Sequence, residues 1–423
     1  MKGGGSWARG MRREGFDWGT GWLHFLVPGR EKLSMAGLTS TVIRVGPLLS
    51  AQLCPPRAVS LGAHFPPYKQ EQRSRWAPLR PYHSSPRSPP PLLGKTLLKL
   101  QAPPSRRASG KFNVPPSAQY VARPAGVCTM MRLPYQETAQ GLDAAFIGVP
   151  LDTGTSNRPG ARFGPRHIRG ESCMVRPHNI STRAAPFESL MVADIGDVNV
   201  NLYDLKDSCR RIRETYQKIM AAGCIPLTLG GDHTITYPIL QAVAEKHGPV
   251  GLVHVDAHTD TGDTALGEKI YHGTPFRRCV DEGLLDCKRV VQIGIRGSSY
   301  SADPYGFCRE QGFRVVLAED CWFRSLVPLM AEVRSQMGAG PVYISFDIDG
   351  LDPSFAPGTG TPEIAGLTTS QGLEIIRGCR GLNVVGCDLV EVAPVYDQSG
   401  NTALTGANLL FEMLCVLPRV KVY

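Results

Sequence analysis

Residues Val253 to Asp260 read Val-His-Val-Asp-Ala-His-Thr-Asp and close a mostly apolar run that begins at Val250. Asp256, His258 and Asp260 occupy alternate positions in this stretch. In an extended segment, residues two apart point the same way, so these three side chains would converge at the end of one strand. All three can bind a metal ion. The stretch therefore predicts a buried strand that ends in a cluster of metal-binding side chains.

A second polar cluster follows another mostly apolar run, which spans Pro341 to Phe346, and it reads Asp347-Ile-Asp349. A helix cap or a turn explains a single aspartate after a strand. It does not explain acidic residues at alternate positions after two strands. We therefore interpret the two clusters as halves of one metal site.

From about residue 144 onwards, short apolar runs alternate with amphipathic stretches. The expected strands are Ala144–Val149, Leu190–Asp194, Ile225–Leu229, Val250–Asp256, Val290–Ile295, Arg314–Leu317, Val342–Asp347 and Val384–Val392. The expected helices are Leu205–Ala222, Tyr237–Lys246, Leu326–Gln336, Ser370–Gly378 and Thr402–Leu417. Short apolar strands between helices are typical of a parallel sheet that is buried on both faces. The pattern predicts an α/β fold. We expect a three-layer α/β/α domain with a mostly parallel central sheet of about eight strands. Ligands of such a sheet bind beyond the carboxyl ends of its strands.

Residues 1 to about 120 differ in composition from the rest of the chain. Residues 1–115 hold 18 Lys and Arg but 4 Asp and Glu, with several proline pairs and many serines. Such a segment buries too little apolar area to offset its ordering entropy, and its composition is that of a mitochondrial transit peptide. We expect residues 1–120 to be a disordered extension with a transit function and residues 121–423 to form one catalytic domain. A plain disordered tail and translation from an upstream start are the alternatives.

The bulk composition excludes several classes of protein. The 423 residues are 42% apolar and 20% charged, and no apolar run approaches the roughly 20 residues that cross a bilayer. The net charge of +9 comes from the first 115 residues, which carry +14, whereas the remainder carries −5. A mildly acidic body suits a small cationic substrate better than nucleic acid. The 12 cysteines include no Cys-x-x-Cys, which indicates a reducing compartment rather than disulfides.

A third candidate segment, Gly230-Gly231-Asp232-His233, follows the expected strand Ile225–Leu229. The paired glycines allow a sharp turn that would present His233, although a lone histidine is more often a core or capping residue. Asp232 is better explained as a supporting or helix-capping group than as a metal ligand.

Without Asp232 and the strand residue His254, the three segments together would bring four Asp and two His side chains to one edge of the sheet. Two ions that share bridging carboxylates need a set of this size, at the roughly 3.5–4 Å spacing of two-metal hydrolases. The set is rich in oxygen and has no thiolate, so Mn²⁺ fits it better than structural zinc. The predicted ligands of two Mn²⁺ ions are His233, Asp256, His258, Asp260, Asp347 and Asp349.

Three further features have two interpretations each. The Gly- and Pro-rich loop Asn157–Arg166 could bind an anion through its arginines, or it could be purely structural. Glu391 lies in an apolar strand, where a carboxylate needs a partner, either a salt bridge within the protein or a cationic substrate. His272 could carry protons near neutral pH, or it could be an ordinary loop histidine.

These motifs resemble the ureohydrolase (arginase) superfamily, and most closely its mitochondrial vertebrate agmatinases, over about residues 121–420. The markers are Gly-Gly-Asp-His at 230–233, Asp-Ala-His-Thr-Asp at 256–260 and Ser-Phe-Asp-Ile-Asp at 345–349. The resemblance implies two Mn²⁺ ions on the six residues named above. It also implies that Asp260 orients the attacking hydroxide, that His272 transfers protons and that Glu391 binds the guanidinium group of the substrate. Agmatine would give urea and putrescine.

The choice of substrate depends on departures from the arginase pattern. Arginases recognise the α-amino group of their substrate with acidic residues that follow a Gly-x-Arg segment. In this chain the corresponding segment is Gly294-Ile-Arg-Gly-Ser-Ser, and no acidic residue follows it until Asp303. Gly262 stands where arginases carry an amide. We therefore expect agmatine rather than arginine. A linear guanidino acid such as 4-guanidinobutyrate, held by loop residues such as Asn157 and Arg162, is the alternative, and a non-catalytic metabolite-binding protein is a third interpretation. Relatives form closed trimers or hexamers, so a homo-oligomer is expected.

Overall fold

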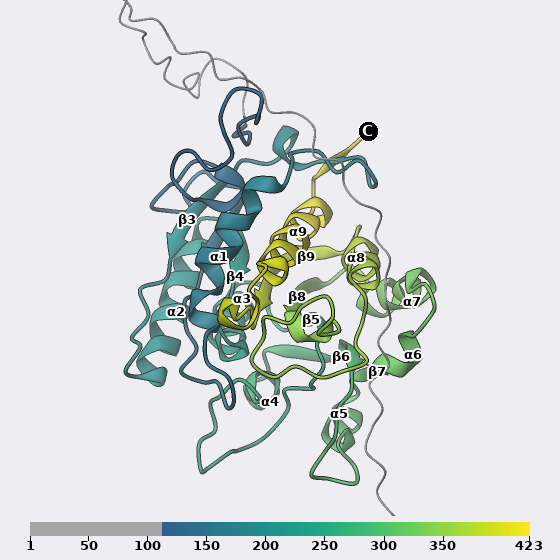
Figure 1. The fold of residues 1–423 in the computed structure, drawn as a ribbon. Coiled ribbons are helices and arrows are strands. Elements are labelled where there is room, and N and C mark those ends of the chain that lie inside the picture. The colour runs from purple at the N-terminus through teal and green to yellow at the C-terminus, as the bar shows by residue number, and fades with distance from the viewer. Residues whose placement is uncertain (1–111) are drawn as a thin grey trace, which may run out of the picture. The chain divides into compact units, whose positions relative to one another are not determined.

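The computed structural model describes residues 112–423, coloured from blue to yellow in Figure 1. The expectations for residues 1–111 lie outside this range. Residues 112–120, which the composition assigns to the extension, include contacts with the body of the domain. The Asn113 side chain donates to the Val192 carbonyl at 2.9 Å, and Arg132 donates to the Pro116 carbonyl at 2.7 Å. Across the described residues, every helix is too short or too polar to cross a membrane.

An eight-stranded sheet forms the centre of the domain, in the order β3-β1-β4-β9-β8-β5-β6-β7. Every pairing within it is parallel. Its strands are β1 (Ala144–Gly148), β3 (Val192–Asp197), β4 (Ile225–Leu229), β5 (Val250–Val255), β6 (Leu285–Ile295), β7 (Arg314–Leu317), β8 (Pro341–Asp347) and β9 (Asn383–Val390). A separate antiparallel pair joins β2 (Ala184–Ala185) to β10 (Lys421–Val422). The expected parallel α/β sheet is confirmed.

Helices cover both faces of this sheet (Figure 1). They are α1 (Gly164–Glu171), α2 (Leu205–Ala221), α3 (Thr236–His247), α4 (Pro275–Asp281), α5 (Gly306–Gln311), α6 (Ala318–Cys321), α7 (Val327–Met337), α8 (Thr369–Gly378) and α9 (Asn401–Val416). One core cluster contains residues of α1, α7, α8 and α9, and the other contains residues of α2, α3 and α4. In β1, Ala144 and Phe146 belong to the first cluster and Ala145 and Ile147 to the second, so the strand is buried on both faces.

The structure corrects several expected boundaries. Strand β3 continues to Asp197, past the expected end at Asp194, because its pairing with β1 continues as far as Gly148 and Asp197. Strand β6 begins at Leu285 instead of Val290, through a segment that mixes polar and apolar residues. Helices α1, α4, α5 and α6 were not expected. They are at most eight residues long, which is too short to show a clear helical period.

Four neighbouring strands in the middle of the sheet carry the polar motifs at their carboxyl ends. In spatial order these strands are β4, β9, β8 and β5. Gly230 to His233 follows β4, Glu391 follows β9, Asp349 follows β8 and Asp256 follows β5. Carboxyl ends of adjacent parallel strands meet at one edge of a sheet, so the topology gathers these side chains in one place.

The turn after β4 leaves no room for a side chain at Gly231. A Cβ at this position would lie 1.9 Å from the Leu151 carbonyl oxygen and 2.7 Å from that of Val149. We expect Gly231→Ala to displace backbone and to lower the free energy of unfolding by roughly 3 kcal/mol or more. Gly170→Ala in α1 is the matched control, since no heavy atom lies within 4 Å of its Cβ. Thermal unfolding of the two variants measures the difference in stability between them. Equal melting temperatures would contradict the conclusion that the turn has no room for a side chain at Gly231.

Candidate metal centre and active site

The six predicted metal ligands lie together at the carboxyl edge of the sheet. His233 Nδ1 faces three carboxylate oxygens, Asp260 Oδ2 at 2.9 Å, Asp256 Oδ2 at 3.2 Å and Asp347 Oδ2 at 3.3 Å. On the other side of Asp256, His258 Nδ1 lies 3.4 Å from Asp256 Oδ1 and 3.3 Å from Asp349 Oδ2. The ligands therefore form two groups that share Asp256, one carboxylate oxygen in each.

The chemistry of this cluster fits divalent cations. Asp256, Asp347 and Asp349 are at most 2% exposed, so water does not screen their charges. Burial and the charges of Asp349 and Asp256 raise the pKa of Asp347 well above its usual range. His233 Nδ1 is buried and has no hydrogen-bond partner, although carboxylates surround it. Bound cations would give that nitrogen a partner and compensate the buried negative charge.

A buried chain of hydrogen bonds fixes the orientation of His233. Ser345 Oγ donates to Asp388 Oδ1 at 2.7 Å, and Asp388 also accepts hydrogen bonds from Thr236 and Tyr343. Because the Ser345 hydroxyl proton points to Asp388, Ser345 Oγ accepts from His233 Nε2 at 2.8 Å. The proton of His233 therefore lies on Nε2, and the Nδ1 lone pair faces the carboxylates.

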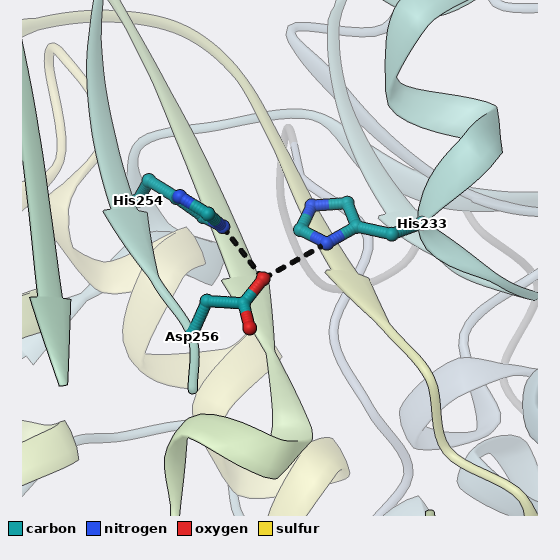
Figure 2. Close-up of side chains that lie close together, drawn as sticks. All are labelled: His233, His254 and Asp256. Atoms are coloured by element: carbon teal, nitrogen blue, oxygen red, sulfur yellow. Dashed lines mark hydrogen bonds and ion pairs between the residues drawn. The ribbon is translucent and has the colours of Figure 1, made fainter. Parts of the chain in front are cut away.

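His254 supports Asp256 from within β5 (Figure 2). Gln292 Nε2 donates to His254 Nδ1 at 3.0 Å, so the imidazole proton is on Nε2, which donates to Asp256 Oδ2 at 2.8 Å. His254 thus acts as a hydrogen-bond donor beside the ligand rather than as a ligand itself. Neither His254 nor Asp388 was assigned a role from the sequence. A polar residue inside an otherwise apolar strand was the available signal in both cases.

Glu391 lies directly after β9 and has one engaged and one free carboxylate oxygen. Oε1 accepts from the His233 backbone N–H and from His272 Nδ1, both at 2.9 Å. Oε2 is buried and has no hydrogen-bond partner. A Cβ on Gly360 would lie 3.6 Å from Oε2, so the absence of a side chain there leaves space beside this oxygen. Among the described residues, the ion pair of Glu391 is with His272, and its second oxygen has no hydrogen-bond partner.

The backbone holds two site residues in the left-handed region. Asp260 has φ +50° and Glu391 has φ +63°. This conformation costs a residue other than glycine roughly 1–2 kcal/mol and persists only where its surroundings impose it. The strain thus coincides with the two carboxylates that face the predicted reaction centre.

His272 is 8% exposed and lies between Glu391 and Ser156, a serine for which the sequence predicts no role. Its Nε2 is 3.0 Å from the Ser156 backbone nitrogen and 2.6 Å from Ser156 Oγ. Burial lowers the pKa of His272, but the hydrogen bond and charge of Glu391 raise it to about 9. Glu391 therefore favours the charged form of the imidazole, which can donate a proton.

A cavity of about 570 Å³ lies beside His272 and three of the predicted ligands, His258, Asp260 and Asp347. Its lining residues are Ser156, His258, Asp260, Tyr271, His272, Gly273, Ser298, Ser299, Tyr300, Asp347, Thr361 and Glu363. The set is rich in hydroxyls and contains three carboxylates and no Arg or Lys. Tyr271 takes the space that the missing side chain of Gly262 leaves, since a Cβ there would lie 2.9 Å from the Tyr271 hydroxyl.

The structure places Asn157 and Arg162 outside this lining. Asn157 Nδ2 donates to the Gly360 carbonyl at 2.9 Å, and Arg162 forms an ion pair with the buried Asp152. Both side chains thus stabilise their loop and the loop beside it. Their contact with a substrate stays a prediction.

The chain matches known proteins over almost all of its described part. The sequence model of the arginase family covers residues 142–415. The mitochondrial agmatinase of Gallus gallus is 79% identical over 330 residues, which are 78% of this chain and 97% of that protein. The mitochondrial guanidino acid hydrolase of Homo sapiens is 78% identical over 317 residues, 75% of this chain and 90% of that protein. The solved structure of proclavaminate amidino hydrolase from Streptomyces clavuligerus aligns with a TM-score of 0.67 at 40% identity and covers 70% of this chain and 100% of that one.

These matches confirm the resemblance and the fold expected from the motifs. The two vertebrate relatives are named mitochondrial, which confirms the mitochondrial localisation expected from the composition. Like them, the chain is an enzyme that hydrolyses C–N bonds of guanidino compounds. With its parallel eight-stranded sheet and its cluster of aspartates and histidines, the chain belongs to the arginase family.

Proposed function

We propose that this enzyme is a binuclear manganese hydrolase that releases urea from a linear guanidino compound. The observation that carries the proposal is the free Glu391 Oε2, buried beside the cluster of metal-binding side chains. A buried anionic oxygen without a partner is costly unless a cation binds it, and a guanidinium offers several N–H donors in one plane.

Two manganese ions would occupy the two groups that share Asp256. His233, Asp260 and Asp347 would complete one group, and His258 and Asp349 would complete the other. Carboxylate oxygens with an imidazole in each group suit Mn²⁺, and no cysteine belongs to the set. When bound, the ions would lower the pKa of water and so supply a nucleophile near neutral pH.

The side chains of this protein would perform the remaining steps. Glu391 Oε2 would hold the guanidinium and orient its carbon towards the cluster. Asp260, fixed in its strained conformation, would orient the attacking water. His272, on the other oxygen of Glu391, would deliver a proton to the departing amine nitrogen, which cannot leave as an anion.

Agmatine is the substrate that the charge of the cavity favours. Its tail ends in an ammonium, and the charged residues in the cavity lining are acidic or histidine. Glu363, whose side chain is 34% exposed, is the acidic residue of the lining outside the predicted ligand set. The products would be urea and putrescine.

A guanidino acid such as 4-guanidinobutyrate is the second candidate, and the name of the human relative favours it. The hydroxyls of Ser298, Ser299 and Tyr300 in the cavity lining are donors that can bind a carboxylate. Both candidates share the guanidino end and differ in the charge of the tail.

Urea release from agmatine, 4-guanidinobutyrate and arginine, measured in parallel with Mn²⁺, decides between these substrates. We expect agmatine to have the highest kcat/KM and arginine the lowest. Glu363→Gln should then raise the KM for agmatine about fivefold, from the loss of roughly 1 kcal/mol of attraction, without raising that for 4-guanidinobutyrate. A higher kcat/KM for the acid would assign the second candidate, and turnover of arginine alone would refute both.

Glu391→Gln tests the guanidinium contact directly. The amide keeps the shape of the side chain but loses the charge, so kcat/KM should fall at least about 100-fold, which corresponds to about 2.7 kcal/mol. Glu214→Gln on the exposed face of α2 is the matched control and should keep full activity. Steady-state kinetics on both variants give the comparison. Wild-type activity in Glu391→Gln would rule out the proposed role.

Ser345→Ala tests the support of His233. Without the hydroxyl, His233 Nε2 loses its acceptor, and we expect Mn²⁺ affinity to fall 10- to 100-fold. Thr236→Val is the control, because Thr236 donates to the same Asp388 carboxylate without contacting the His233 ring. Titration of the chelator-treated proteins with Mn²⁺ in a calorimeter measures the affinity independently of turnover. Equal affinities in both variants would contradict the role of Ser345.

A further inference from the structure

Ser156, His272 and Glu391 form a row of three hydrogen-bonded side chains that ends in the cavity. Ser156 Oγ lies 2.6 Å from His272 Nε2, and His272 Nδ1 lies 2.9 Å from Glu391 Oε1. Ser156 and His272 line the cavity, whereas Glu391 is 1% exposed. The serine hydroxyl is therefore the end of the row that lies in the cavity lining.

The partners of His272 determine where its proton lies. The Glu391 carboxylate, when ionised, only accepts hydrogen bonds, so Nδ1 carries the proton. The backbone N–H of Ser156 only donates, and it points to Nε2 at 3.0 Å. In the neutral form of the ring Nε2 is therefore unprotonated, and both the amide and the hydroxyl of Ser156 converge on its lone pair.

The hydroxyl and the amide behave differently when His272 gains a second proton. A protonated Nε2 becomes a donor, so it opposes the Ser156 N–H and needs an acceptor. The hydroxyl oxygen can accept as well as donate, so it is the one atom of Ser156 that suits both protonation states of the imidazole. A hydroxyl can therefore accept a proton from the imidazolium while it donates its own proton to another group.

Several bonds outside this row hold Ser156 in place. The Gly154 N–H donates to the buried Asp232 at 2.8 Å, and the Gly154 carbonyl accepts from the His272 backbone N–H at 3.1 Å. At the far end of the loop, the Gly160 N–H donates to the buried Asp152 at 2.8 Å. The loop thus stays anchored at both ends without the Ser156 hydroxyl.

We propose that Ser156 is the proton relay between His272 and the departing amine in guanidine hydrolysis. The Nε2–H bond of the imidazolium breaks as a new O–H bond forms on Ser156 Oγ. The original hydroxyl proton of Ser156 moves to the amine nitrogen, where a new N–H bond forms as the C–N bond breaks. His272 ends neutral, the serine is unchanged and the amine has gained one proton, which came from the water consumed. This inference rests on the proposed function.

Replacement of the hydroxyl tests the relay on the full-length protein. With the substrate that the wild type hydrolyses best, Ser156→Ala should lower kcat 10- to 100-fold with little change in KM. Ser156→Thr retains a hydroxyl and should recover kcat to within about threefold of wild type. Ser301→Ala, the same deletion on an exposed loop serine outside the cavity lining, should leave kcat unchanged.

Isotopic substitution of the solvent separates a relay from a purely structural role. In mixtures of H₂O and D₂O, kcat of the wild type should curve with deuterium content because two protons move together. In Ser156→Ala the dependence should become linear, because one proton moves. A linear dependence in the wild type, or unchanged kcat in Ser156→Ala, would overturn the relay. Equal losses in the Ala and Thr variants would do so too. A wild type that releases no urea from any guanidino compound refutes the proposed function instead.

Discussion

Buried negative charge is the constraint on which the rest of this structure depends. Asp256, Asp347 and Asp349 lie within one cluster and are almost fully excluded from water, with Glu391 next to them. Carboxylates at such distances repel one another strongly in a medium of low polarity. They are compatible with folding where N–H and O–H donors surround them and cations bind between them. The parallel sheet meets this requirement by placing the ends of four strands side by side, so that each strand contributes acids and the adjacent backbone contributes donors.

The same parallel register supplies a layer of supporting residues inside the sheet. Ser345 of β8 pairs with Asp388 of β9, and His254 of β5 pairs with Gln292 of β6. Each pair forms a hydrogen bond across neighbouring strands and fixes the proton of one histidine. The orientation of the catalytic groups thus depends on strands, which are rigid, while the cavity lining comes from loops, which can vary between relatives of different substrate preference.

The sequence alone predicted the parallel sheet and brought six candidate metal ligands to one edge of it, because both leave local signals. Apolar runs mark the strands, and alternate spacing at Asp256, His258 and Asp260 marks the cluster. The order of the strands, and with it the partnership of Ser345 and Asp388, depends on contacts between residues far apart in the chain. Ser156 gave no signal at all, since a serine in a Gly- and Pro-rich loop is ordinary until the fold brings His272 to it. The short helices were missed for the same reason, because tertiary packing rather than a long amphipathic pattern stabilises them.

Asp256 presents one oxygen to each group of predicted ligands, and this sharing would make two bound cations interdependent. A cation in one position would change the charge that the shared carboxylate presents to the other position. The two binding events are then coupled through one side chain, with a reciprocal coupling free energy. In thermodynamic terms the affinity of each position would depend on whether the other is filled, so the centre would not behave as two independent sites.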